Sequence, residues 1–219
     1  MTNRLLLRLS PLLIGLFVSG CSSLLPKPPI NTAYYSLDSI QADSEAVSAL
    51  NTEQNLPTLI INTPKAAAGF DTRHMMYTRS AYRLEYFARN EWLDTPSDML
   101  QPLMVKAIEQ THAFKAVLPK LAAVKTDLRL ESELIRLVQN FNTNPSQVLF
   151  SLRVTVIDSS TNQVIALRQF DETVSAESDD PIGGVRASNL AVTQALEKLR
   201  QFTKQLSSDW AKSGQNIQK

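Results

Sequence analysis

One cysteine, Cys21, constrains this chain of 219 residues more than any other feature. A single cysteine excludes an intramolecular disulfide, so the fold must rely on a hydrophobic core. Arg4 and Arg8 precede an uncharged, mostly apolar run over residues 9–20, which is too short for a membrane-spanning helix of about 20 apolar residues. A basic start, a short apolar centre and small residues at its end are typical of a secretory signal peptide over residues 1–20.

The four residues Val18-Ser19-Gly20-Cys21 resemble a bacterial lipobox, where a diacylglycerol joins the cysteine thiol and the chain is cut just before it. The alternative is an ordinary cut after Gly20 that leaves a free thiol, which is a liability in an exported protein. We therefore expect a lipoprotein with a diacylglycerol and an N-acyl chain such as palmitate on Cys21. Ser22 stands where an aspartate often marks retention in the inner membrane, which favours the outer membrane, with the protein facing the periplasm.

Composition beyond the signal peptide limits the classes of partner. Removal of residues 1–20 takes two arginines and no acidic residue, so 20 basic and 21 acidic side chains remain of the original 22 and 21. This balance gives no electrostatic footprint for nucleic acid. No second apolar run approaches membrane-spanning length, so the lipid anchor alone is expected to hold the protein at the membrane. Two or more acyl chains anchor stably at ~0.8 kcal/mol per buried CH₂ group.

The chain after Cys21 is expected to contain one tether, one domain and one tail. Three prolines between positions 26 and 29 predict a semi-rigid tether over residues 21–32, at ~3 Å per residue. The remaining length suits a single domain over residues 33–208. Residues 209–219 are predicted to form a polar C-terminal tail.

Alternation of apolar and polar side chains predicts the central strands of a sheet. Residues 128–134 and 150–156 alternate in this way, and residues 164–174 form a third strand across the turn at 158–162. The alternation breaks at Leu134-Ile135, where we expect a β-bulge or a strand end. Shorter strands are expected at residues 34–37, 59–61, 75–77 and 82–87.

A first helix is predicted from apolar residues at helical spacing, which are Leu100, Leu103, Met104, Ala107 and Ile108. Its N-cap is expected at Ser97 or Asp98. A start at Thr95 is disfavoured, because Pro102 clashes with the carbonyl group four residues earlier and is tolerated only near the first turn.

A second, longer helix is expected after Gly183-Gly184, with an apolar face that ends at Leu206. The residues after Leu206 are expected to fray. Strands, a helix, a β-meander and a final helix together indicate the α+β class. We predict a single domain with a mainly antiparallel sheet and two principal helices packed on one face.

The sequence contains no pattern that predicts catalysis. It has no G-x-S-x-G elbow, P-loop, dinucleotide fingerprint or H-E-x-x-H motif. His74 and His112 lie far apart without metal-ligand spacing, which favours a structural role over a metal site. Asp179-Asp180 could bind a cation, but they precede a proline ahead of a helix and are better interpreted as turn and cap residues. We therefore expect no enzyme, no metal and no cofactor besides the acyl groups.

Aromatic residues concentrate between Tyr77 and Trp92. Strand alternation would place Tyr82, Leu84 and Tyr86 on one face. These aromatics either fill the core under the first helix, since large aromatics dominate cores, or form an exposed interface. We predict Tyr82, Tyr86 and Trp92 as a partner-binding surface or its support. On this prediction, Trp92→Ala loses partner binding while thermal melting stays nearly unchanged.

These residues also carry a resemblance to a known family, the auxiliary lipoproteins of ABC-type transport systems. The resemblance covers most of the chain and rests on Cys21, Tyr34-Tyr35-Ser36-Leu37, Leu59–Ile61, Tyr77, Tyr82–Ala88, Trp92, Leu100–Ile108 and Phe114–Val117. This chain has Thr78-Arg79 where family members often carry an arginine just after the first tyrosine, so a role tied to that arginine is open here.

The resemblance implies a non-catalytic accessory component in intermembrane lipid transport. Its partners would be an ABC transporter or a mammalian-cell-entry-domain protein, and identical copies could self-associate. One alternative is a lipid carrier that holds an acyl chain in its own core, which predicts an apolar cavity of several hundred Å³ between sheet and helices. A further alternative is an activator of a cell-wall synthase.

Overall fold

The computed structural model describes residues 31–38, 56–120 and 124–216. Internal contacts separate Met1–Asn31 from a unit of Thr32–Lys219, and every described helix and strand belongs to the second unit. The predictions for the signal peptide, for Cys21 and for most of the tether lie outside the described residues.

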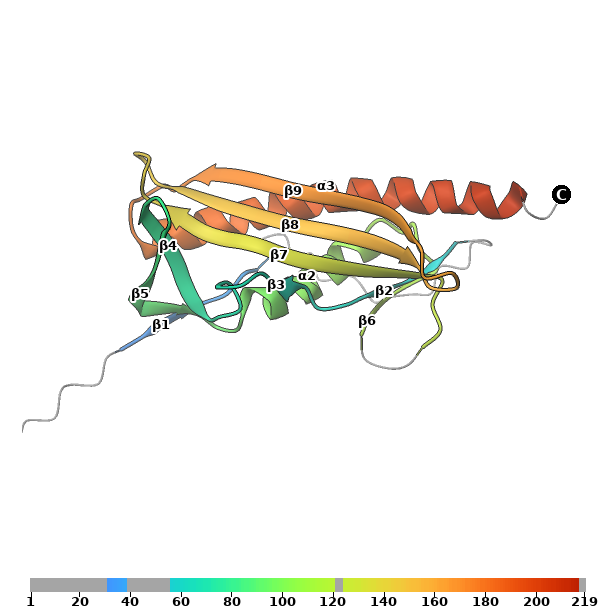
Figure 1. Cartoon of the computed structure of the whole chain (residues 1–219), viewed down its shortest axis with the longest axis horizontal. Coiled ribbons are helices and arrows are strands. Elements are labelled where there is room, and N and C mark those ends of the chain that lie inside the picture. The colour runs from blue at the N-terminus through green and yellow to red at the C-terminus, as the bar shows by residue number, and fades with distance from the viewer. Residues whose placement is uncertain (1–30, 39–55, 121–123, 217–219) are drawn as a thin grey trace, which may run out of the picture. The chain divides into compact units, whose positions relative to one another are not determined.

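The described strands form one nine-stranded sheet built around β7, Leu128–Asn140 (Figure 1). One edge of β7 pairs along its whole length with β8 (Gln147–Asp158), and β8 pairs in turn with β9 (Val164–Ser175). The other edge of β7 is shared by three short parallel strands, which are β2 (Thr58–Ile61), β3 (Lys65–Ala66) and β4 (His74–Ser80). The sheet is completed by β5 (Arg83–Trp92), β1 (Ala33–Tyr35) and β6 (Ala116–Pro119).

The predicted α+β class is confirmed, and the sheet is mixed. The long β7–β8 and β8–β9 ladders and the β4–β5 hairpin are antiparallel, whereas the short pairings of β1, β2, β3 and β6 are parallel. The break expected at Leu134-Ile135 is a bulge, because the register shifts between Leu134 and Arg136 and β7 then continues to Asn140. A bulge of this kind bends the strand and increases its local twist.

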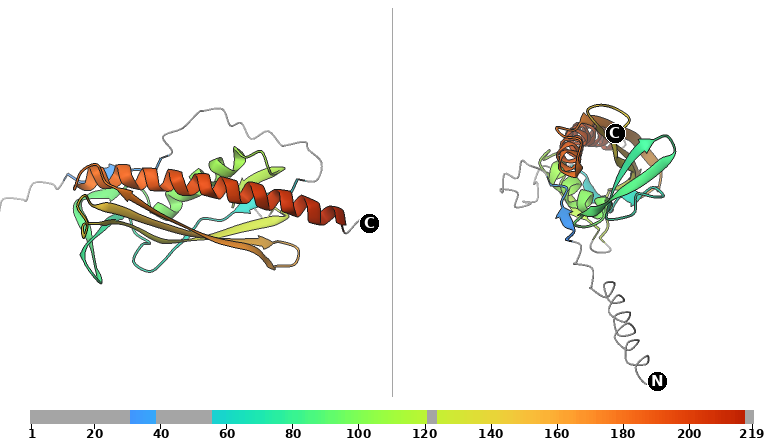
Figure 2. Two further views of the ribbon diagram at one scale, coloured as in Figure 1. Left: turned by 90° about the horizontal axis from the view of Figure 1, so that it is seen from above. Right: turned by 90° about the vertical axis from the view of Figure 1, so that its left-hand side faces the viewer.

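Two helices, α2 (Pro96–Glu109) and α3 (Pro181–Asn216), lie on the same face of the sheet (Figure 2). They pack against each other, and α3 also packs on β8 and β9. The apolar residues of the strand alternation, such as Leu130 and Leu152, are fully buried beneath them. Leu100 and Ile108 of α2 and Leu199 of α3 close this core from above.

The predicted start of the first helix is wrong, because the N-cap is Thr95. Its hydroxyl accepts a hydrogen bond from the Asp98 backbone N–H at 3.3 Å and donates one to the Asp98 carboxylate at 2.6 Å. Pro96 takes the first helical position, where a missing N–H costs nothing and the fixed φ suits the helix. Pro102 therefore lies inside the helix, on its exposed side.

The second helix is longer at both ends than predicted. It begins before Gly183-Gly184, because the Asp180 carboxylate accepts a hydrogen bond from Gly183 N–H at 2.7 Å and caps the first turn. It continues to Asn216, so the prediction that the chain frays after Leu206 is wrong for residues 207–216. The partly buried side chains of Phe202, Leu206 and Trp210 repeat every four residues and hold this end against the fold.

Candidate docking surface

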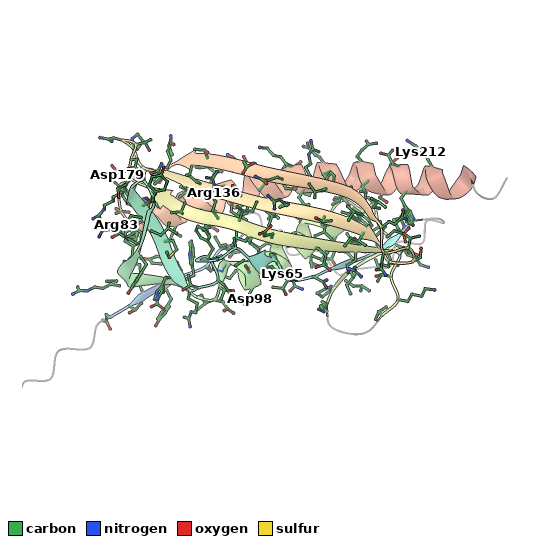
Figure 3. The ribbon with its side chains drawn as sticks, in the orientation of Figure 1. Lys65, Arg83, Asp98, Arg136, Asp179 and Lys212 are labelled. Carbon is green, nitrogen blue, oxygen red and sulfur yellow. The ribbon has the colours of Figure 1, made fainter. Side chains whose placement is uncertain are left out.

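The hairpin of β4 and β5 ends in a two-residue connection, Ala81-Tyr82, between the paired residues Ser80 and Arg83. Figure 3 shows Arg83 at the opposite end of the sheet from Lys212. Tyr82 is fully exposed and has a φ of +65°. This left-handed conformation costs about 1–2 kcal/mol for a residue with a Cβ atom. The fold therefore exposes the Tyr82 ring to solvent at a position where the backbone is strained.

An exposed strip continues from the tip along β5. The alternation predicted from the sequence places Leu84 and Tyr86 on one face, where they are 47% and 54% exposed. Tyr86 stacks on the His74 ring of β4, with ring centroids 4.2 Å apart. His74 Nδ1 lies 3.8 Å from a Glu91 carboxylate oxygen. We call Tyr82, Leu84 and Tyr86 the hairpin strip.

The opposite face of the hairpin is a cluster of aromatic rings. Tyr77 packs on Phe87 at 4.6 Å between centroids and meets the edge of Phe141 at 5.7 Å. The guanidinium of Arg79 lies 4.9 Å from the Tyr77 ring centroid and 5.7 Å from that of Phe141, which adds a cation–π contact. A hydrogen bond to the Glu85 carboxylate raises the pKa of Tyr77, because it stabilises the protonated hydroxyl. These contacts hold the hairpin in place on the face opposite Leu84 and Tyr86.

The structure separates Trp92 from the other two predicted site residues. Its side chain is only 4% exposed and belongs to the hydrophobic core. The Trp92 backbone N–H donates to the Arg73 carbonyl at 2.8 Å, and the Arg73 Nε donates to the Trp92 carbonyl at 3.2 Å. Trp92 thus anchors the base of β5, while Tyr82 and Tyr86 lie on the surface.

The sequence alternation places Leu84 on the face of Tyr82 and Tyr86, but it predicts only the two tyrosines as site residues, and it does not predict His74 for this surface. His74 lies on the other strand of the hairpin, and only the pairing of β4 with β5 brings its ring under Tyr86.

A second surface feature is an apolar groove between β9 and the C-terminal half of α3. Its volume is about 480 Å³, and it is lined by Ile165, Ala166, Phe202, Gln205, Leu206, Asp209 and Trp210. The lining residues come from two segments about forty positions apart, so no local sequence pattern predicts the groove. The Arg168 guanidinium lies 5.7 Å from the Phe202 ring centroid at this end of β9.

The acidic pair Asp179-Asp180 is occupied with structural hydrogen bonds. Asp179 accepts a bond from Ser146 N–H at 2.7 Å, and Asp180 caps α3, which confirms the turn and cap interpretation. These bonds lower the pKa of both carboxyl groups. The described residues contain no group of three His, Cys, Asp or Glu side chains placed to hold a metal ion. None of the described helices has the length and apolar character that a membrane crossing requires.

The described residues thus form a single α+β domain with an exposed aromatic hairpin. The chain belongs to the family of ABC-type transport auxiliary lipoprotein components, whose sequence pattern matches residues 35–199. The family resemblance seen in the sequence is therefore confirmed. No curated protein matches the chain.

Two of the solved structures that share the fold are similar to this chain over most of its length. Protein XCC0632 from Xanthomonas campestris superposes with a TM-score of 0.65 at 20% identity, over 86% of this chain and 98% of that chain. A structure described as an uncharacterized protein superposes with a TM-score of 0.61 at 13% identity, over 79% of this chain and 99% of that chain. At these identities the likeness concerns the fold alone.

Proposed function

We propose that this chain is a non-catalytic accessory lipoprotein that docks a component of an ABC-type transport system through the hairpin strip. The observation that carries the proposal is Tyr82, a fully exposed aromatic residue in a left-handed conformation at the hairpin tip. Backbone strain of this kind persists at binding and switch sites because the surrounding structure enforces it. Tyrosine is also enriched in the buried centre of protein interfaces.

The support behind the strip suits a rigid docking element. Phe141 follows β7 and fixes the hairpin through its backbone N–H, which donates to the Thr78 carbonyl at 2.8 Å. The rings of Tyr77, Phe87 and Phe141 pack on one another where β4 pairs with the end of β7. A surface that is already ordered loses less conformational entropy on binding.

The anchor in this proposal is an acylated Cys21 in the outer membrane, with the domain facing the periplasm. A tether over residues 21–32, at ~3 Å per residue, would give the domain a reach of a few tens of ångströms. In this proposal the partner is an ABC transporter component or a mammalian-cell-entry-domain protein that acts in intermembrane lipid transport. In this proposal the chain holds its partner in place by direct contact and does not catalyse a reaction.

The proposal is tested by photo-crosslinking in intact cells. A photoreactive amino acid replaces Tyr82 in one strain and Thr193, an exposed residue of α3, in a control strain. We expect an adduct with a transport component from position 82 and none from position 193. An adduct with a cell-wall synthase at position 82 would overturn the proposal in favour of the synthase-activator alternative, and equal labelling from both positions would contradict a local surface.

The apolar groove favours a second candidate function, that of a lipid carrier. Its volume of about 480 Å³ lies in the range of small-ligand sites. Trp210 lines the groove, whereas the other tryptophan, Trp92, is buried in the core. A brominated fatty acid bound in the groove would quench Trp210, and the Trp210→Phe variant would lose that quenching. Absence of quenching in the parent chain would exclude the groove as an acyl-chain site.

A further inference from the structure

The strand β9 forms a long edge of the sheet (Figure 1). Among the described residues it pairs only with β8, and it has 12 residues, whereas the edge strands β1 and β6 have three and four. Natural edges are usually short, charged or covered, because their free N–H and C=O groups are a template for pairing. Val164 and Leu167 of β9 are nevertheless 59% and 62% exposed.

The hydrogen bonds show which backbone groups of β9 point outward. Ala176 N–H donates to the Ser146 carbonyl at 2.8 Å at the end of the β8–β9 ladder. Hydrogen-bonded pairs alternate along an antiparallel ladder, so the even-numbered residues of β9 exchange bonds with β8. The odd-numbered residues present N–H and C=O groups at the open edge, and these are Leu167, Gln169, Asp171 and Thr173.

We propose that the occupant of this edge is a second copy of the chain, whose β9 pairs antiparallel with the first around a two-fold axis at Phe170. A two-fold axis makes the contact self-complementary and places side chains of the same face opposite each other. In this register Arg168 lies opposite Glu172 of the second copy, and Gln169 lies opposite Asp171. Glu172 already pairs with Lys198 of its own copy at 2.6 Å, and Arg168 joins that ion pair from across the axis.

Charge selects this register over its neighbours. An axis at Arg168 places two guanidinium groups directly opposite each other, and an axis at Asp171 does the same for two carboxylates, which is destabilising. An axis at Gln169 sets Leu167 against Asp171. An axis at Leu167 pairs only the first half of the strand. The axis at Phe170 avoids each of these conflicts and pairs nearly the whole of β9.

The register predicts one specific distance, which crosslinking can test in the full-length chain in detergent. The two copies of residue 169 lie diagonally across the new ladder, ~7–8 Å apart. Gln169→Cys with a short bismaleimide should therefore give a covalent dimer. Arg153→Cys is the matched control, because Arg153 lies opposite Gln169 within one copy but three strand spacings of ~4.8 Å from its counterpart. The parent chain controls for crosslinking through Cys21.

Two further variants test whether the open edge carries the contact. In the Gln169→Cys background, Leu167→Pro removes an N–H that points outward, so the crosslink should disappear while the melting temperature changes little. Arg168→Glu places a carboxylate opposite Glu172 and should reduce the crosslink at least several-fold. Absence of a dimer with Gln169→Cys, equal yield with Arg153→Cys, or crosslinking that survives both edge variants would overturn the inference. These outcomes do not depend on the hairpin strip.

Discussion

The Gln139 side chain occupies the space that a Cβ atom on Gly184 would need. A Cβ built on Gly184 would lie 2.1 Å from Gln139 Oε1. Gln139 is buried in β7, and its Nε2 donates to Ser146 Oγ at 2.9 Å and to the Asp180 carbonyl at 3.2 Å. This contact sets how closely the first turn of α3 approaches the sheet.

We expect Gly184→Ala to lower the free energy of unfolding by about 1–3 kcal/mol, because the added methyl group overpacks a buried contact. Gln139→Ala removes the obstacle, so the double variant should be more stable than the sum of the two single effects predicts. Urea unfolding of all four chains measures this coupling. Strict additivity would show that Gln139 does not set the approach of the helix.

Trp92→Ala is expected to destabilise the domain by about 3–5 kcal/mol, since the indole is buried in the core. This replaces the expectation from sequence alone, in which melting stays nearly unchanged. Leu93→Ala is the matched control, because its neighbouring side chain is exposed and should matter little. An unchanged melting temperature for Trp92→Ala would contradict the core position.

Asp158 makes stability depend on acid pH. Hydrogen bonds from the hydroxyl and N–H of Ser160 and the N–H of Thr161 lower the pKa of this carboxyl group below its usual 3.8. The folded state therefore favours the ionised form. Its contribution is complete above the unfolded pKa and is lost as the pH falls through the lower folded pKa, from about 4 downward. Urea unfolding between pH 7 and pH 3 should show a shallower decline for Asp158→Ala than for the parent chain.

The strand alternation predicted the centre of the sheet because burial on one face imposes a period of two. Residues 128–134 and 150–156 follow that rule and form the core of β7 and β8. The two-residue strand β3 is too short for any periodicity and exists only through its pairing with β7. The start of α2 was misplaced because Pro96 at the first helical position outweighs the conflict at Pro102.

The candidate site was only partly predictable for a related reason. The sequence shows where aromatic residues are concentrated. Local alternation does not show that the Tyr86 side chain is exposed to solvent or that the Trp92 side chain is buried in the core. Tyr82 carries no turn signature, since left-handed turn positions favour Gly or Asn, and its position at the tip depends on the register of β4 with β5.

Acylation at Cys21 is tested by the intact mass of the protein from the membrane fraction. We expect a diacylglycerol and an N-acyl chain on Cys21 of a chain that begins at that residue. Cys21→Ser should leave the signal peptide uncut and remove the lipid mass. An unmodified thiol on a soluble, processed chain would instead support the ordinary cut after Gly20.

The most direct test of the docking surface compares two glycine substitutions at left-handed positions, Tyr82→Gly and Asn162→Gly. Asn162 has a φ of +56° in the exposed β8–β9 turn, so both changes place glycine at a left-handed position that it adopts freely. Asparagine tolerates this conformation better than tyrosine, so stability should stay nearly unchanged for Asn162→Gly and be equal or slightly higher for Tyr82→Gly. Co-purification of the transport component from solubilised membranes is the readout. We expect Tyr82→Gly to reduce it at least tenfold and Asn162→Gly to leave it unchanged. Full co-purification with Tyr82→Gly would contradict the hairpin strip as the docking surface.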